Sequence, residues 1–361
     1  LKVPGLPDTI TITKPVFAIT ETAPAALKQD AGAALQGPFV TIGADLKMQA
    51  GKGTHEFDSL LMVGKDAKGK RVIDLMGSAK DPKGLFEFKG LTVKSLGLAS
   101  VYDGGAWDFK LDGSADLNSA ALTFDTEIKK VNNKIEYVAT LTGGTAGISA
   151  KDVAGRDIPG LDKVALTKVV VAGGRLVADL AFGAKKTPGE LAAFHVGTQT
   201  GATLAFTLDK LAFADLVPGS AGSALDGVEV DDLSLIVVPK DGAGLKPGDT
   251  AIPQHIQDNL KKVIADAAKH DATKSGYALK AGFNLLADLD IKGSTGMGSL
   301  TASAGLTETV VPIIGTISAS TFKPGVPKAD SIKGLDLGVA LPDLKVPGLP
   351  DTITITKPVF A

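Results

Sequence analysis

Apolar and polar residues alternate along much of this chain. The stretch Asp8–Ile19, DTITITKPVFAI, places threonine and isoleucine at alternate positions. A period of two is typical of a β-strand that buries one face. Pro15 has no N–H to donate to a neighbouring strand, so we expect this part of the strand to lie at an edge, an end or a bulge.

The same kind of pattern predicts strands along most of the sequence. Turn signals rich in Gly, Asn and Asp separate many of them, and these residues tolerate the positive φ of hairpin turns. The signals are Lys68-Gly69, Asp103-Gly104-Gly105, Asn132-Asn133, Gly173-Gly174 and Asp241-Gly242. The further strands are predicted over 38–49, 54–64, 69–77, 83–89, 91–102, 106–113, 119–129, 133–142, 161–172, 174–183, 201–208, 228–238, 276–291, 298–305 and 309–322.

A helical period is rare and is clearest over residues 252–270. Ile256, Leu260, Val263, Ile264 and Ala267 fall on one face there, with charged residues elsewhere. We expect this amphipathic helix to cap an open sheet face or a barrel end. Shorter helices are predicted over 22–35, with a proline in the first turn, and over 188–195.

These patterns define the expected fold class. The protein should be mainly β, built from antiparallel meandering sheets with one to three short capping helices. The sheets form either a sandwich or an open, barrel-like, elongated architecture. The expected subdivision is a connector and edge strand over 1–18, β-rich subdomains over 19–158 and 159–321, and a proline-rich connector and strand over 322–361.

One sequence of 18 residues occurs twice. Residues 1–18 and 344–361 both read LKVPGLPDTITITKPVFA, an offset of 343 (344 − 1). Four interpretations fit: a window of a tandem array, a deliberate duplication that completes the fold, a strand exchanged between filament units, and an artefact of assembly. We favour the array because the second copy continues from a proline-punctuated run and both ends look cut. The chain would then be one period of the array.

Composition narrows the class of protein. Of 361 residues, 44% are hydrophobic and 5% aromatic, so the core must be mostly aliphatic. The net charge is −2 without a basic block, which argues against nucleic-acid binding. No apolar run approaches the roughly 20 residues of a transmembrane helix. The lack of cysteine favours an extracellular or cell-surface location, with the periplasm or cell envelope as the alternative.

Residues that carry chemistry are scattered. The four histidines are far apart in sequence, and no nucleophile motif accompanies them. GKDAKGK at 64–70 resembles a phosphate-binding loop, but Arg71 follows it in place of Ser or Thr, so a hairpin turn is expected. Asp231-Asp232 and the pair Asp288 and Asp290 are interpreted as solvated rather than as a calcium site. We therefore expect no enzyme activity, no cofactor and no metal.

The leading functional hypothesis is a structural tandem-repeat protein. Its units would form a filament, stalk or surface fibre and join through a shared or exchanged strand, with identical repeats as partners. The alternative is an elongated β-sheet module of the cell envelope that binds or transfers lipid. The residues predicted to make the inter-repeat contact are Thr9, Ile10, Thr11, Ile12, Thr13, Thr352, Ile353, Thr354, Ile355 and Thr356.

Overall fold

The described part of the chain is mainly β, with 67% in strands and 12% in helices. The computed structural model describes residues 10–22, 36–50, 53–66, 68–82, 85–102, 107–131, 134–145, 147–158, 164–182, 186–197, 199, 201–212, 228–242, 244–246, 248–249, 252–270, 272–291, 309–317, 335–340, 344–345, 354–355 and 359–360. The chain divides into two compact units, residues 1–146 with 168–174 and residues 147–167 with 175–361. The subdivision expected from the sequence stays a prediction.

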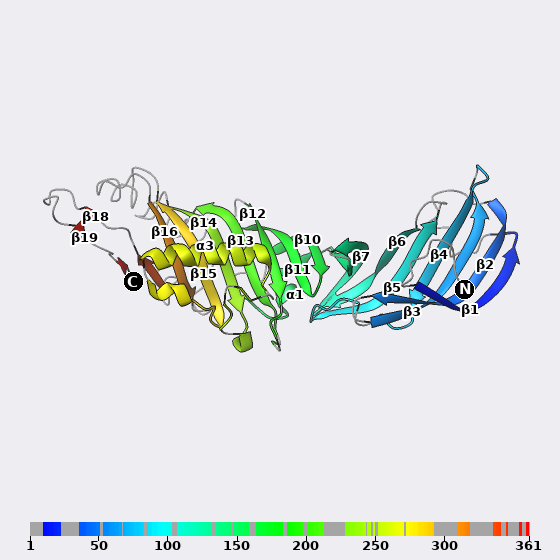
Figure 1. Cartoon of the computed structure of the whole chain (residues 1–361), viewed down its shortest axis with the longest axis horizontal. Coiled ribbons are helices and arrows are strands. Elements are labelled where there is room, and N and C mark those ends of the chain that lie inside the picture. Colours follow the sequence, from blue (N-terminus) through cyan, green and yellow to red (C-terminus); the bar gives the residue numbers. More distant parts are fainter. Residues whose placement is uncertain are drawn as a thin grey trace. The chain divides into compact units, whose positions relative to one another are not determined.

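Unit 1 is an antiparallel meander in which each strand pairs with the next along the chain (Figure 1). A turn at Asp66–Lys70 joins the third and fourth strands, as expected for GKDAKGK, and Gly69 adopts a φ of 77° there. The strands are β1 (Ile10–Thr20), β2 (Gln36–Ala50), β3 (Gly53–Lys65), β4 (Arg71–Ala79), β5 (Leu91–Tyr102), β6 (Trp107–Leu117), β7 (Ala120–Val131) and β8 (Lys134–Gly143). The second half of β10 (Ala165–Ala172) pairs with β8.

One face of the unit 1 sheet forms its apolar interior. Ile42, Leu61 and Leu75 are cross-strand neighbours on β2, β3 and β4, and all three are buried. Along β5, buried residues recur at about every second position, which is the pattern that the sequence shows. The hydrophobic alternation therefore sets which face of the sheet turns inward.

Unit 2 continues with antiparallel pairing between successive strands. Its elements are β9 (Ile148–Ser149), α1 (Ala150–Ala154), β11 (Arg175–Phe182), β12 (Thr187–Phe194), β13 (Thr203–Ala212), β14 (Val228–Val238), η3 (Lys240–Gly242), α3 (Gln254–His270), η4 (Ala272–Gly276), β15 (Gly282–Ile291), β16 (Thr309–Ile317), β17 (Leu335–Ala340), β18 (Leu344–Lys345), β19 (Thr354–Ile355) and β20 (Val359–Phe360). The first residues of β10 pair with β9.

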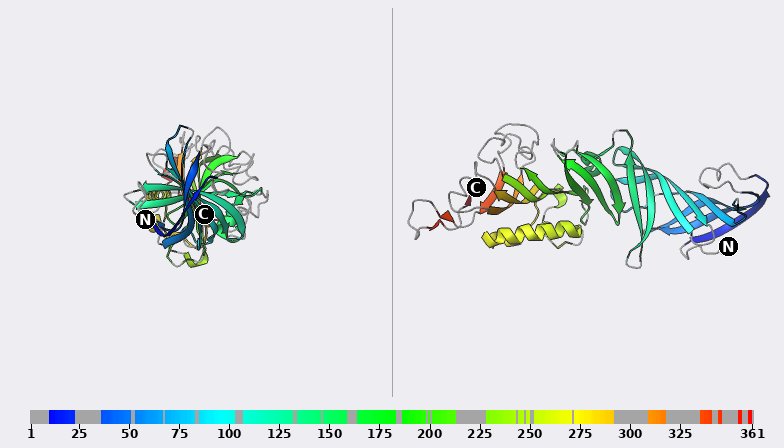
Figure 2. Two further views of the ribbon diagram at one scale, coloured as in Figure 1. Left: turned by 90° about the vertical axis from the view of Figure 1, so that its right-hand side faces the viewer. Right: turned by 90° about the horizontal axis from the view of Figure 1, so that it is seen from above.

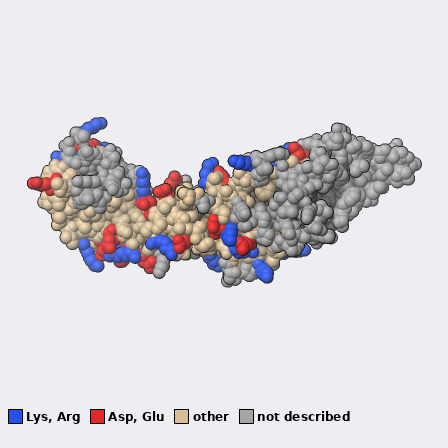
Figure 3. Space-filling model, turned by 180° about the vertical axis from the view of Figure 1, so that it is seen from behind, with Lys and Arg blue, Asp and Glu red and all other residues tan. Residues whose placement is uncertain are grey.

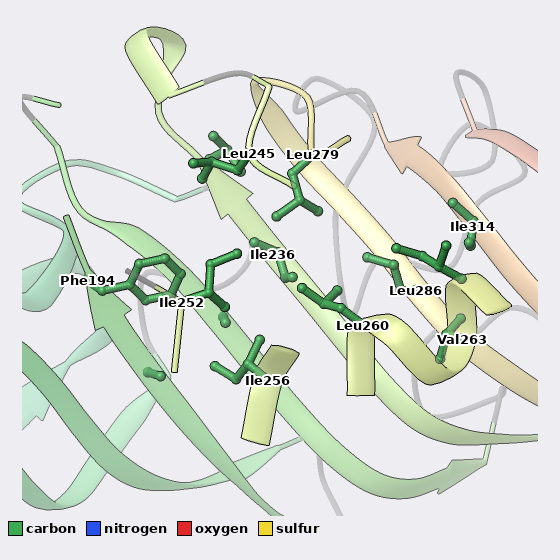
Figure 4. Packing of buried hydrophobic residues seen from close by; sticks show 14 of the residues in the cluster. Phe194, Ile236, Leu245, Ile252, Ile256, Leu260, Val263, Leu279, Leu286 and Ile314 are labelled. Atoms are coloured by element: carbon green, nitrogen blue, oxygen red, sulfur yellow. The ribbon is translucent and has the colours of Figure 1, made fainter. Parts of the chain in front are cut away.

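The helix α3 covers one face of the unit 2 sheet, as the sequence predicts (Figure 2). Ile256, Leu260 and Val263 have no exposed surface and point toward Ile236, Leu286 and Ile314 of the strands (Figure 4). Because α3 covers the second face, β14 is buried at six successive positions instead of at alternate ones.

Polar contacts fix the position of α3 on the sheet. The Asn259 side chain donates to the Ser234 hydroxyl at 3.0 Å and to the Asp232 carbonyl at 3.1 Å. Gln257 donates to the Ile252 carbonyl at 2.9 Å, just before the helix. These hydrogen bonds satisfy polar groups that the packing would otherwise leave buried and unpaired.

Several sequence-based expectations are wrong or lie outside the described residues. Residues 187–194 form strand β12 instead of a helix, and residues 85–90 form turns and bends instead of a strand. The pair Asp288 and Asp290 is buried, with each residue only 4% exposed, so its interpretation as solvated is wrong. The predicted helix over 22–35 and the predicted strand over 298–305 lie outside the described residues, apart from residue 22.

Candidate functional site: the duplicated strand

The first copy of the duplicated sequence forms strand β1, and a bulge divides it into two halves. Ile10–Thr13 pair with Met48–Asp45 of β2, and Val16–Thr20 pair with Gly43–Phe39. The register shifts between Thr13 and Val16, and Lys14 adopts a φ of 49°. Pro15 lies in this bulge, which confirms the expectation from its missing N–H.

The two halves of β1 differ in exposure. Ile12, before the bulge, is 4% exposed. After the bulge, Val16, Phe17 and Ile19 are 70%, 58% and 78% exposed. With Val40 of β2, these three make up the large hydrophobic side chains exposed in the described part of the chain. Exposed apolar residues therefore gather on the second half of β1.

The second copy has different strand partners. Val359–Phe360, which repeat Val16–Phe17, form β20 and pair antiparallel with Ala340 and Val339 of β17. Thr354–Ile355, which repeat Thr11–Ile12, pair with Lys345 and Leu344. The identical sequence therefore contacts β2 in one copy and β17 in the other.

These placements bear on the predicted contact residues. Ile10, Thr11, Ile12 and Thr13 pair with β2 inside unit 1. Thr354 and Ile355 pair with β18. The remaining four, Thr9, Thr352, Ile353 and Thr356, lie outside the described residues. Their role in contacts between repeats stays a prediction.

A ladder of ion pairs lies beside β1 on the face of the sheet opposite to the apolar interior. The Asp45 carboxylate is 3.1 Å from Lys14 Nζ and 2.6 Å from Lys80 Nζ, and Lys80 Nζ is 3.0 Å from Asp58. These side chains border an open cavity of about 770 Å³, which Val16, Leu60 and Met76 also line. The ladder was missed in the sequence, although Asp45 and Asp58 are directly opposed across the β2–β3 hairpin and need cations between them.

The ladder shifts the acid–base properties of its members. The hydrogen bonds from Lys80 and then Lys14 lower the pKa of Asp45. The hydrogen bonds to Asp45 and Asp58 raise the pKa of Lys80. The ladder is therefore a charged structural contact at neutral pH, since neither shift brings a proton donor or acceptor near pH 7.

Unit 2 contains a second group of carboxylates, near α3. Lys262 pairs with Asp232 and lies 3.5 Å from Asp288. Burial raises the pKa of Asp288, against the opposing effect of Lys262. Within the described residues, no group of three or more acidic or histidine side chains is arranged to hold a metal ion.

The surface of the described residues shows no large area of one charge on the face drawn in Figure 3, where Lys and Arg alternate with Asp and Glu. Among the helices of the described part of the chain, none is long and apolar enough to cross a membrane. Comparison with protein families, with curated proteins and with solved structures finds no match to this chain. The duplicated strand is therefore the feature from which function must be argued.

Proposed function

We propose that this chain is a structural repeat unit of an extended β-rich array, such as an extracellular filament, stalk or fibre. One observation carries the proposal: the same sequence pairs with β2 of unit 1 in one copy and with β17 of unit 2 in the other. A segment that fits both places suits the junction between successive units. In repeat proteins of this kind, stability comes from each unit and from its contacts with its neighbours.

The packing of the interior favours a structural role over a lipid-binding one. Phe57, Leu75 and Leu117 lie on the inward face of unit 1, and none of them has accessible surface. A groove that holds lipid needs apolar side chains that a ligand can reach. At these three positions the inward side chains are covered, as in an ordinary protein core.

The proposal can be tested with a two-period chain, residues 1–361 continued by residues 19–361, so that the duplicated segment between them is shared. We expect it to unfold at a higher urea concentration than the single chain, because each added cross-strand pair stabilises by roughly 0.2–1 kcal/mol. The control joins two complete chains through a flexible Gly/Ser linker. Its unfolding midpoint should match that of the single chain.

Two results would contradict the structural role. Equal unfolding midpoints for the shared, linked and single chains would mean that neighbouring periods do not stabilise each other. The other result would come from native mass spectrometry of the purified chain. A lipid bound in a fixed ratio to the protein would favour the lipid-transfer alternative.

A further inference from the structure

The second half of β1 has one paired edge and carries exposed apolar side chains. Val16–Thr20 pair with β2 through one edge, and within the described residues no strand pairs with the other edge. Phe17 and Ile19 are mostly exposed on this half. An open edge with apolar side chains readily accepts a further strand.

The second copy shows which strand these residues can accept. Phe360 repeats Phe17 and is paired with Val339, and Val359 repeats Val16 and is paired with Ala340. Because the sequences are identical, β17 of a neighbouring copy is a partner that the exposed half of β1 already fits. Continued along both strands, this register places Ile19 opposite Leu337, so apolar residues oppose apolar residues.

Strand direction is compatible with both pairings at once. The duplicated strand is antiparallel to β2 in the first copy and antiparallel to β17 in the second. A strand has two edges, and a meander requires each strand to run opposite to both neighbours. The order β17, duplicated strand, β2 therefore continues the pattern of both units without reversing any strand.

From these observations we infer that the duplicated strand is shared between two copies of this repeat. β17 of one copy pairs with one edge of Val16–Thr20, and β2 of the next copy pairs with the other edge. This inference rests on the proposed function and specifies which strands form the junction between repeats. The contact between repeats is then Val16–Thr20 after the bulge, which pairs through both edges, whereas Ile10–Thr13 before the bulge pair with β2.

The lack of cysteine in the chain makes disulfide cross-linking a direct test. In the two-period chain, one variant carries Val339→Cys with Phe360→Cys. A second carries Phe360→Cys with a cysteine at the second period's counterpart of Ile42. Residues paired across antiparallel strands are close enough for a disulfide, so both variants should cross-link at least about tenfold faster than a register control.

The register control combines Gly338→Cys with Phe360→Cys, because Gly338 is one residue out of register and its side-chain direction is opposite. If a Phe360 variant does not fold, Ala340→Cys with Val359→Cys tests the same pairing. Cross-linking of both first variants supports the shared strand. Cross-linking to only one neighbour, or to neither, overturns it.

The two proposals fail in different ways. If Phe360 cross-links only to the counterpart of Ile42 while the two-period chain still gains stability, the array stands and the shared strand is wrong. If the two-period chain gains no stability, the array itself is wrong. The urea midpoint and the cross-linking rate therefore report on separate claims.

Discussion

At the scale of single residues, two lysines have similar partners in different surroundings. Lys80 bridges Asp45 and Asp58 at the exposed surface of unit 1. Lys262 pairs with Asp232 and approaches Asp288, whose side chain is only 5% exposed. An exposed ion pair stabilises a protein little, whereas a buried carboxylate lacks the hydration that would stabilise its charged form. Among the carboxylates that pair with these two lysines, Asp288 is therefore the one whose charge should matter most.

We predict that Asp288→Asn changes the dependence of stability on pH. Burial raises the pKa of Asp288 in the folded protein, while the unfolded chain titrates near an ordinary value of about 3.9. The folded state holds this proton more tightly, so its contribution to stability is complete below that value and is lost as pH rises through the folded-state pKa. The asparagine variant has no such loss.

The measurement is urea unfolding at pH 4 and pH 7. The Asp288→Asn variant should gain in unfolding midpoint relative to the parent chain as pH rises. Asp258→Asn on the exposed face of α3 removes the same charge and is the control. If the two variants behave alike, the ion pair with Lys262 balances the effect of burial, and if Asp288→Asn is destabilised more at pH 7 than at pH 4, the ion pair outweighs it. Either result contradicts the prediction.

At the scale of elements, the sequence correctly predicts the strands and helices whose local residue pattern favours the same structure as their tertiary packing does. The strand over 228–238 and the helix over 252–270 are both confirmed, the first with the same bounds. β12 was predicted as a helix because GELAAF is rich in helix-forming residues. Its last four residues are all buried between β11 and β13, so sheet packing overrides the local preference.

A short helix was missed although its sequence contains a signal. Ser149 caps α1, and Asp152 completes a capping box with it. Gly155 ends the helix in the left-handed conformation at a φ of 65°. The spacing Ser-x-x-Asp followed by Gly is a recognised helix signature, but only five residues separate its two ends, too few to show a helical period.

We predict that Leu260→Ala destabilises the protein by about 2–5 kcal/mol, the usual range for a buried leucine. Leu260 has no exposed surface and packs between α3 and the sheet. The neighbouring Lys261 is exposed, so Lys261→Ala should change stability by no more than about 0.5 kcal/mol. Urea unfolding of both variants checks this. A loss below about 1 kcal/mol for Leu260→Ala would mean that α3 is not anchored through this face.

At the scale of the whole molecule, the sequence identifies the duplicated segment but not which half of its strand is exposed. Pro15 predicts an interruption of the strand, and the bulge is there. The contact between repeats is nevertheless predicted at the TITIT stretch, because this stretch has the stronger alternation of apolar and polar residues. Ile12 and Phe17 are paired with Leu46 and Ile42, which lie on one face of β2, yet Ile12 is buried and Phe17 is exposed, a difference that no local pattern contains.

The open edge of β1 also predicts how the isolated chain behaves in solution. We expect it to self-associate as its concentration rises, because an unpaired edge with apolar residues recruits other strands. Ile19→Lys should weaken this association, since Ile19 is 78% exposed and lies on the edge half of β1. A lysine on an edge strand opposes pairing because its charge would have to be buried.

Charge alone can raise solubility, so the control must add the same charge elsewhere. Thr123→Lys does so at an exposed position on β7, where Thr123 is paired with Ser114 of β6 on one side and with Thr142 of β8 on the other. Both variants change the net charge from −2 to −1. Sedimentation velocity over a range of protein concentrations should show weaker association for Ile19→Lys alone. Equal association of the two variants would show that self-association does not use the β1 edge. The exposed side chains of this edge would then give no support to pairing between copies.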